Sequence, residues 1–155
     1  LVSLDEYHGL FIEISHNPLL MEDGVKTAFD TMSLVDLKEQ SWKVMEPVYI
    51  EKTKKLVDRF EFERSKFFGS DDVAQVAVAA NHNRVDTLLV ESGKVIPGKI
   101  NKENGRIIEK DLENPEVDDV LDDLVELVLR SNGNVVLLPK ERMPSTTGVA
   151  AIFRY

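Results

Sequence analysis

The chain has 155 residues, of which 43% are hydrophobic, and a formal net charge of −9 at pH 7. This composition predicts a folded domain, and the acidic charge disfavours direct RNA contact, because proteins bind nucleic acids largely by neutralising phosphates. The sequence contains no Cys and only three scattered His, which argues against disulfides and zinc sites, so we expect no metal and no cofactor.

The first 32 residues predict short elements and a connector. Leu1–Leu4 is typical of the end of a strand, and Leu10, Phe11 and Ile14 follow with helical spacing. No basic region precedes an apolar stretch, and no apolar run approaches a membrane span, so we expect neither a signal peptide nor a membrane partner. The missing initiator Met and the lack of cysteine lead us to expect the C-terminal part of a longer, cytoplasmic protein.

A long helix is expected from Ser33 onwards. Ser33 can cap this helix, Asp36 lies near its positive end, and apolar residues recur at steps of three or four. Pro47 lies inside the pattern, so we expect a kink or a break into two helices near Glu46. Four phenylalanines close the segment, and we prefer core packing over an aromatic ligand platform for all of them: Phe60, Phe62, Phe67 and Phe68.

The next predicted elements are a helix, a strand and a hairpin. Ser70 can cap the helix, and the small apolar residues within 73–80 suggest close packing against a sheet. Val85–Glu91 is a continuous apolar run, which is typical of a central strand covered on both faces. Lys94–Ile100 and Arg106–Glu109 flank the turn sequence NKENG and predict the hairpin.

A last helix and two strands complete the pattern. Asn114-Pro115 is a good helix start, and Gly133 supplies a stop. Val135–Leu138 and Val149–Phe153 read as strands. Because helices alternate with strands, the sequence predicts an α/β fold whose largely parallel or mixed sheet is covered by helices.

Acidic residues concentrate around the start of this last helix. Asp118/Asp122 and Asp119/Asp123 are spaced by four, so on a helix each pair would share a face and repel. A divalent ion or a basic partner would relieve this repulsion, whereas the simpler interpretation is a solvated face. The nine acids of the segment are Glu109, Asp111, Glu113, Glu116, Asp118, Asp119, Asp122, Asp123 and Glu126.

The loop PKERMPSTTG between the last two strands is the second candidate site. It carries two cations and three hydroxyls, a combination able to hold a phosphate or a carboxylate. We prefer to interpret it as the crossover between two strands, with anion binding as a secondary use. Its polar residues are Lys140, Arg142, Ser145, Thr146 and Thr147. Signatures of a nucleophile or a phosphate loop are absent, so we expect no catalytic residue.

Two stretches resemble a known family. Val76–Glu91 is similar to a helix-then-strand segment in the C-terminal domain of Pelota and of the class-one peptide release factors of archaea and eukaryotes. Val117–Tyr155 is similar to the end of that domain, and its last residues resemble the ending LPxxxMPxxTxxAAIxRY of bacterial members of this superfamily. The matching positions are Leu138, Pro139, Met143, Pro144, Thr147, Ala150, Ala151, Ile152, Arg154 and Tyr155.

The resemblance covers about residues 33–155. It implies an α/β/α sandwich with a mixed sheet, like the release-factor C-terminal domain and the kink-turn-binding ribosomal proteins. Residues 1–32 would then be the tail of a preceding middle domain plus a connector. In release factors the middle domain carries a Gly-Gly-Gln tripeptide that promotes peptidyl-tRNA hydrolysis, and this chain contains none.

We therefore expect a non-catalytic protein-interaction domain of a bacterial release-factor-like protein. It would act in translation or ribosome rescue, with the ribosome or a translational GTPase as its partner, as the resemblance implies. Two alternatives are kept. One is an RNA-binding module of the kink-turn-binding type that uses Lys140, Arg142 and the Ser/Thr cluster, and the other is a metal-dependent hydrolase that uses carboxylates near the acidic helix.

Overall fold

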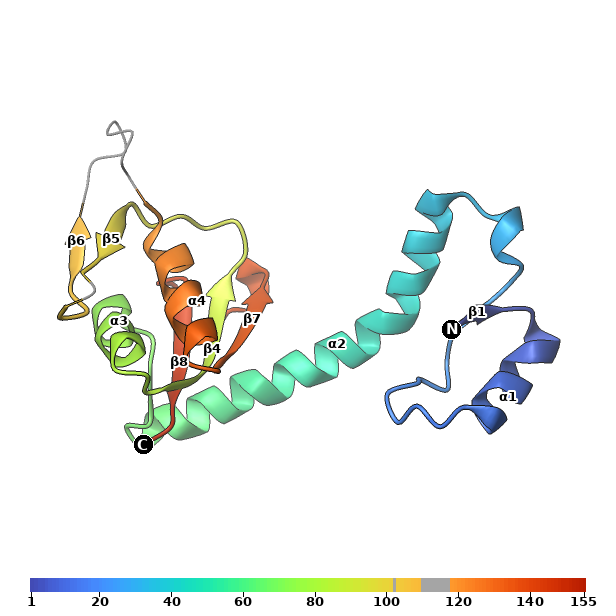
Figure 1. Ribbon diagram of the computed structural model, residues 1–155, viewed down its shortest axis with the longest axis horizontal. Coiled ribbons are helices and arrows are strands. Elements are labelled where there is room, and N and C mark those ends of the chain that lie inside the picture. Colours follow the sequence, from blue (N-terminus) through green and yellow to red (C-terminus); the bar gives the residue numbers. More distant parts are fainter. Residues whose placement is uncertain (102, 110–117) are drawn as a thin grey trace. The chain divides into compact units, whose positions relative to one another are not determined.

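The computed structural model describes residues 1–101, 103–109 and 118–155 (Figure 1). The chain divides into two compact units, Leu1–Lys54 and Lys55–Tyr155. The division falls inside the long helix α2, Leu34–Ser65, so this helix contributes residues to both units. No helix among the described residues combines the length and the apolar character that a bilayer crossing requires.

The first unit pairs two short strands beside a helix. β1, Val2–Ser3, and β2, Val25–Lys26, are parallel, and the helix α1, Asp5–Ile14, and the short 3₁₀ helix η1, Phe29–Thr31, complete the unit. The strand predicted at the start of the chain is confirmed as β1. His8 of α1 is buried, and its Nε2 lies 2.9 Å from the carbonyl oxygen of Glu22, which holds the segment before β2 against α1.

The predicted start of α2 is confirmed, and the helix is continuous across Pro47. The backbone N–H of Asp36 donates to Ser33 Oγ at 3.1 Å, so Ser33 caps the helix as predicted. The helix continues through Pro47, so a break into two helices is wrong, whereas Figure 1 shows α2 bent in its first half, in agreement with the other predicted outcome, a kink. Proline removes only one backbone N–H from the helix, and in a helix of 32 residues the neighbouring turns retain their own hydrogen bonds.

Core packing is confirmed for one of the four phenylalanines. Phe60 is fully buried, whereas Phe62, Phe67 and Phe68 are exposed, so the core prediction is wrong for these three. Phe62 lies two residues after Phe60, on the opposite side of α2, and the other two phenylalanines follow the end of this helix. The chain reverses at Phe67, whose φ of 66° is left-handed, and the N–H of Phe68 donates to the carbonyl oxygen of Glu63. This turn directs the Phe67 side chain into solvent, where it is 92% exposed.

The second unit is built around a mixed sheet with the strand order β3-β8-β4-β7. β4, Val85–Glu91, is parallel to β7, Asn134–Leu138, and antiparallel to β8, Val149–Phe153, which is in turn antiparallel to β3, Gly69–Ser70. The bounds of β4 and β8 coincide with the predicted strands. β4 is an interior strand as expected, and the mixed sheet is confirmed.

Helices cover both faces of this sheet. α3, Val73–Asn81, and α4, Val120–Arg130, contact each other over one face, where Leu88 and Val90 of β4 join their core (Figure 1). Successive side chains of a strand point to opposite faces, so Leu89 faces the other way. α2 contacts β4 through Arg59, whose Nη2 lies 2.9 Å from Asp86 Oδ2 beside a β-bulge, and contributes the fully buried Phe60. The predicted α/β/α arrangement is therefore confirmed.

The predicted start of the first helix in this unit is wrong. Asp72, not Ser70, caps α3 by accepting from the N–H of Gln75 at 2.8 Å, because Ser70 is already paired with β8. Asp119 caps α4, so the helix begins at Val120, downstream of the predicted start. The predicted start itself, Asn114 and Pro115, lies outside the described residues.

The predicted hairpin is confirmed with shorter strands. β5, Gly98–Ile100, and β6, Ile107–Glu109, are antiparallel. Gly105 in the intervening turn has a φ of 70°, and a Cβ at this position would lie 2.8 Å from Val78 Cα. A glycine is therefore required here, and it allows the turn to pack closely against α3.

Candidate functional site

Two of the predicted acidic residues form internal hydrogen bonds. Asp119 Oδ1 accepts from the backbone N–H of Ile96 at 2.9 Å and of Leu121 at 3.0 Å. Asp123 Oδ2 accepts from the N–H of Ile100 at 2.8 Å. These two carboxylates join the hairpin region to the first turn of α4, which gives them a structural role that the sequence did not suggest.

The other two acids are exposed. Asp118 lies 3.6 Å from Lys99 Nζ, and Asp122 occupies the first turn of α4. Asp118 and Asp119 precede the first helical residue, so the predicted pairs Asp118/Asp122 and Asp119/Asp123 do not lie within one helix. Of the remaining acids in this run, Asp111, Glu113 and Glu116 lie outside the described residues. Within residues 1–101, 103–109 and 118–155, no three His, Asp or Glu side chains converge to hold a metal ion.

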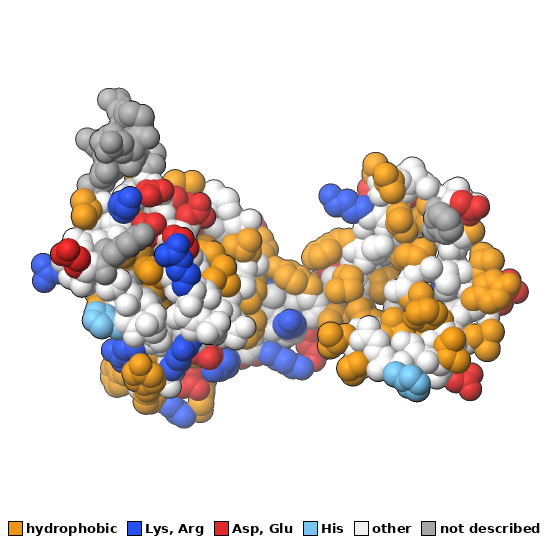
Figure 2. All heavy atoms as spheres, viewed as in Figure 1, with side chains coloured by type: hydrophobic (Ala, Val, Ile, Leu, Met, Phe, Trp, Pro, Cys, Tyr) orange, Lys and Arg blue, Asp and Glu red, His pale blue; other side chains and the backbone are white. Residues whose placement is uncertain are grey.

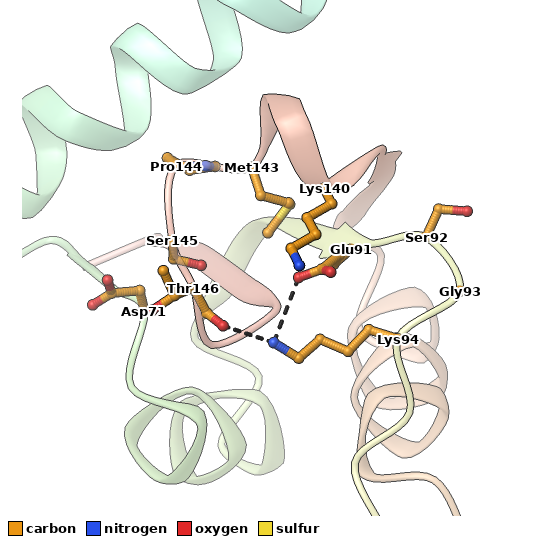
Figure 3. A pocket seen from close by; sticks show the side chains of 10 residues that line it. All are labelled: Asp71, Glu91, Ser92, Gly93, Lys94, Lys140, Met143, Pro144, Ser145 and Thr146. Atoms are coloured by element: carbon orange, nitrogen blue, oxygen red, sulfur yellow. Dashed lines mark hydrogen bonds and ion pairs between the residues drawn. The ribbon is translucent and has the colours of Figure 1, made fainter.

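A cavity of about 840 Å³ opens at the carboxyl ends of β4 and β7 (Figure 3). Three segments form its wall: Asp71 after β3, the turn 91–94 after β4, and the loop 140–146 before β8. In sheets with parallel strands, this end is where connecting loops converge. The predicted crossover loop therefore forms part of a cavity wall.

One ion pair fixes the turn after β4 to the crossover loop. Lys94 Nζ donates to the carbonyl oxygen of Thr146 at 2.7 Å and lies 3.5 Å from Glu91 Oε2 (Figure 3). The Glu91 side chain is only 11% exposed, so Lys94 neutralises a largely buried carboxylate. Gly148, with a φ of 96°, leaves room for Lys94, because a Cβ there would lie 2.5 Å from Lys94 Cδ.

Two of the three predicted hydroxyls are used inside the fold. Ser145 Oγ donates to the carbonyl oxygen of Val149 at 2.6 Å, and Thr147 Oγ1 donates to the carbonyl oxygen of Asp71 at 2.7 Å. These bonds hold the loop against the sheet, so the two hydroxyls are not free for an anion in this arrangement. Thr146 lines the cavity and is exposed.

The two predicted cations lie on the 3₁₀ helix η2, Lys140–Arg142. Lys140 lines the cavity and forms no ion pair with any described residue, whereas Arg142 is half-buried and does not line it. The cavity wall carries two carboxylates, Asp71 and Glu91, against Lys94 and Lys140. Asp71 also pairs with Arg64 at 3.1 Å. This wall is therefore suited to a polar ligand rather than to a highly charged one.

The sequence analysis missed Asp71, Glu91 and Lys94 as cavity residues. Their positions in the sequence point to them, because Glu91 is the last residue of β4 and Lys94 and Asp71 closely follow β4 and β3, at the same end of the sheet. Figure 2 shows one face of the second unit, on which acidic and basic side chains lie among each other.

The comparison with protein families gives a match that covers the first half of the chain. The model of bacterial archaeo-eukaryotic release factor family 3 matches residues 1–84. The chain belongs to this family. The match includes residues 1–32, which the sequence analysis interpreted as a tail and connector. Family 3 membership confirms the resemblance to bacterial members of the release-factor superfamily and supports a translation-related role.

Solved structures agree with this fold. The C-terminal domain of a peptide chain release factor from Methanosarcina mazei matches with a TM-score of 0.60 and 20% identity over 83% of this chain and 96% of that one. Archaeoglobus fulgidus Pelota matches with a TM-score of 0.53 and 19% identity, covering 99% of this chain and 48% of that one. None of the curated proteins matches the chain.

A third structure is described as a model of ribosome-bound archaeal Pelota and ABCE1. It matches with a TM-score of 0.56 and 20% identity over 97% of this chain and 40% of that one. The family 3 chain therefore spans nearly all of the release-factor domain but less than half of either Pelota chain.

Proposed function

We propose that this family 3 chain is a non-catalytic interaction domain that acts in translation or ribosome rescue through contacts with other proteins. The observation that carries the proposal is the combination of family 3 membership with a fold that covers 96% of the archaeal release-factor C-terminal domain. The cavity described above supports a binding role, because its two carboxylates pair with cations, Glu91 with Lys94 and Asp71 with Arg64, rather than with a nucleophile.

The organisation of the chain is part of the proposal. Residues 1–32 are the tail of a preceding middle domain plus a connector, and residues 33–155 are the C-terminal domain. In support, the Pelota structures cover 99% and 97% of this chain while this chain covers 48% and 40% of theirs, so those relatives hold further chain. Any catalytic step would then belong to a part of the protein outside this chain.

The partner in this proposal is the ribosome or a translational GTPase, in the cytoplasm. The Pelota relative is described as ribosome-bound, together with ABCE1, which supports a ribosomal setting. Direct RNA contact contributes little in this proposal, because the chain carries 28 acidic against 19 basic residues and two hydroxyls of the predicted RNA-contact loop bond inside the fold.

Co-sedimentation tests the proposal. The full-length protein is centrifuged with bacterial ribosomes through a sucrose cushion at low and moderate salt, and we expect it in the ribosomal pellet. Ribosome-free centrifugation is the control for aggregation. Recovery of the protein only in the supernatant under both conditions would contradict the proposal. A peptidyl-tRNA hydrolysis assay with the 155-residue chain alone is expected to show no release above background.

A further inference from the structure

A second cavity in the Lys55–Tyr155 unit has a different chemistry. This groove, of about 520 Å³, has an apolar floor from α3 and β8 and two arginines on its walls. The floor consists of Ala74, Val78, Ala79 and Phe153, and the arginines are Arg84 and Arg106. We call it the arginine groove. Val78 is 39% exposed, so the floor presents apolar surface to solvent.

Arg84 is held in place on one side of the arginine groove. Its Nη2 donates to the carbonyl oxygen of Tyr155 at 2.9 Å. Its guanidinium carbon also lies 5.9 Å from the centre of the Phe153 ring and 5.7 Å from the centre of the Tyr155 ring. The ring contacts and the hydrogen bond restrict the rotamers of the Arg84 side chain, which lowers the entropy cost of binding a ligand. The remaining N–H groups of its guanidinium can still donate to that ligand.

Arg106 is positioned by the hairpin turn. The N–H of Gly105 donates to the carbonyl oxygen of Asn101 at 2.7 Å, and the close approach of Gly105 to Val78 fixes the turn against α3. The backbone N–H of Arg106 donates to Asn104 Oδ1 at 2.9 Å. The residue is therefore fixed at its backbone beside the groove floor, and its side chain is exposed.

The arginine groove is positively charged, whereas the chain as a whole is negatively charged. The chain has a net charge of −9, yet the described lining of this groove contains two arginines and no carboxylate. Arg59, Arg64 and Arg130 all form ion pairs with acidic residues. Among the residues that the structure describes, neither Arg84 nor Arg106 pairs with an Asp or Glu side chain, and Arg84 instead contacts the main-chain oxygen of Tyr155, the last residue of the sequence. Two cations beside an apolar floor are suited to an anionic ligand with an apolar part.

We propose that the arginine groove binds an acidic segment of a partner protein, in which an aliphatic or aromatic side chain lies between carboxylates. The apolar side chain fills the floor at Val78 and Ala74, and the carboxylates pair with Arg84 and Arg106. A protein segment fits better than RNA, because the floor is apolar and the chain as a whole repels phosphates. This inference rests on the proposed function and specifies the chemistry of its protein partner.

Fluorescence anisotropy with the 155-residue chain tests the groove without ribosomes. The probe is a fluorescein-labelled peptide in which leucine and glutamate alternate. One comparison peptide replaces glutamate by lysine, and another replaces leucine by serine. We expect binding of the first peptide alone, with an affinity that falls as salt rises. Arg106→Glu is expected to weaken binding by about tenfold or more, since it removes a charge-assisted contact and adds a repulsive one.

Lys99→Glu is the matched control, because Lys99 is exposed on the same hairpin but does not line the groove. It makes the same change of charge and is expected to alter the affinity less than twofold. Val78→Asp tests the floor independently and is expected to weaken binding to a similar extent as Arg106→Glu. Circular dichroism confirms that each variant is folded.

Three results would overturn the inference. They are absence of binding to the leucine–glutamate peptide, equal binding by the Arg106→Glu and Lys99→Glu variants, and displacement of the peptide by single-stranded RNA. Each leaves the ribosome co-sedimentation result unaffected. Conversely, failure of co-sedimentation with intact peptide binding would reject the ribosomal role and retain the groove.

Discussion

Thr147, on the loop before β8, donates a hydrogen bond to the carbonyl oxygen of Asp71, just after β3, over an Oγ1–O distance of 2.7 Å. The same hydroxyl lies 3.2 Å from the carbonyl oxygen of Val149, at the start of β8. This one side chain therefore joins the crossover loop to two strands at the end of the sheet where the larger cavity lies.

Replacing Thr147 by valine should destabilise the second unit. The substitution keeps the side-chain shape but leaves a partly buried acceptor without its donor, which costs about 1–3 kcal/mol. Urea unfolding followed by circular dichroism measures this change. Thr146→Val is the matched control, because Thr146 is exposed and its carbonyl oxygen, not its hydroxyl, contacts Lys94, so a change below about 0.5 kcal/mol is expected. Equal losses for the two variants would refute a specific role for Thr147.

Asp119→Ala should cost more stability than Asp122→Ala. Asp119 Oδ1 accepts from two backbone N–H groups, at Ile96 and Leu121, so its loss removes a helix cap and a tertiary contact worth together about 1–3 kcal/mol. Asp122 is exposed and stabilises α4 only through its interaction with the helix dipole, which contributes about 0.3–1 kcal/mol. Chemical unfolding of both variants provides the comparison, and a reversed order would show that Asp119 does not anchor α4.

Phe60→Ala should be strongly destabilising, unlike Phe62→Ala. Phe60 is completely buried, and truncating a buried phenylalanine costs about 3–5 kcal/mol. Phe62 lies on the same helix but is 56% exposed, so its substitution should cost less than about 1 kcal/mol. Thermal unfolding of both variants tests the face that α2 presents to the sheet. Similar melting temperatures would contradict the position of Phe60.

Phe67→Gly should stabilise the protein. Phe67 holds a left-handed φ of 66° at the end of α2, a conformation that costs a residue with a Cβ about 1 kcal/mol relative to glycine. The side chain is 92% exposed, so little packing is lost. Phe68→Gly serves as the control, since Phe68 has no positive φ and gains nothing from glycine. The free energy of unfolding from urea titration should rise for the first variant and fall for the second.

The pKa of Asp5 should rise in a Lys26→Gln variant. The hydrogen bond from Lys26, at 2.8 Å, and the positive charge of its ammonium hold the pKa of Asp5 below its usual value, and Asp5 raises the pKa of Lys26 in return. The contribution of Asp5 to stability is therefore present above its unfolded pKa and is lost as the pH falls through the lower folded pKa.

Carboxyl carbon chemical shifts, followed by NMR during an acid titration, measure the Asp5 pKa directly. Lys43→Gln, which removes an exposed lysine elsewhere in the first unit, should leave it unchanged. High salt should bring the wild-type value closer to that of the Lys26→Gln variant, because both partners are exposed and salt screens their attraction. An unchanged Asp5 pKa in Lys26→Gln would show that this pair does not form in solution.

The elements of the fold were predictable wherever apolar patterns are strong. Val85–Glu91 and Val149–Phe153 have the same bounds in the sequence prediction and in the structure, because a continuous apolar run leaves few alternatives to a buried strand. Helix starts were less predictable. Ser70 and Asp72 are both good caps, and only pairing of Ser70 with β8, a long-range contact, decides between them.

The candidate site was only partly predictable. Lys140 and Thr146 do line a cavity, but Ser145 and Thr147 bond within the fold, since nothing in the composition of a loop shows which carbonyl groups approach its hydroxyls. The exposure of Phe67 was also missed. Hydrophobicity alone favours burial, whereas the backbone turn that ends α2 sets the direction of this side chain.

The position of β8 between β3 and β4 has a consequence for biosynthesis. A nascent chain that has emerged only as far as Leu138 already contains β4 and β7, but it lacks the strand that shields the other edge of β4 and connects it to β3. Vectorial folding during translation therefore stalls with an open strand edge until Phe153 is available. Products truncated before Val149 should consequently be aggregation-prone and become substrates for chaperones and proteolysis rather than shortened interaction domains.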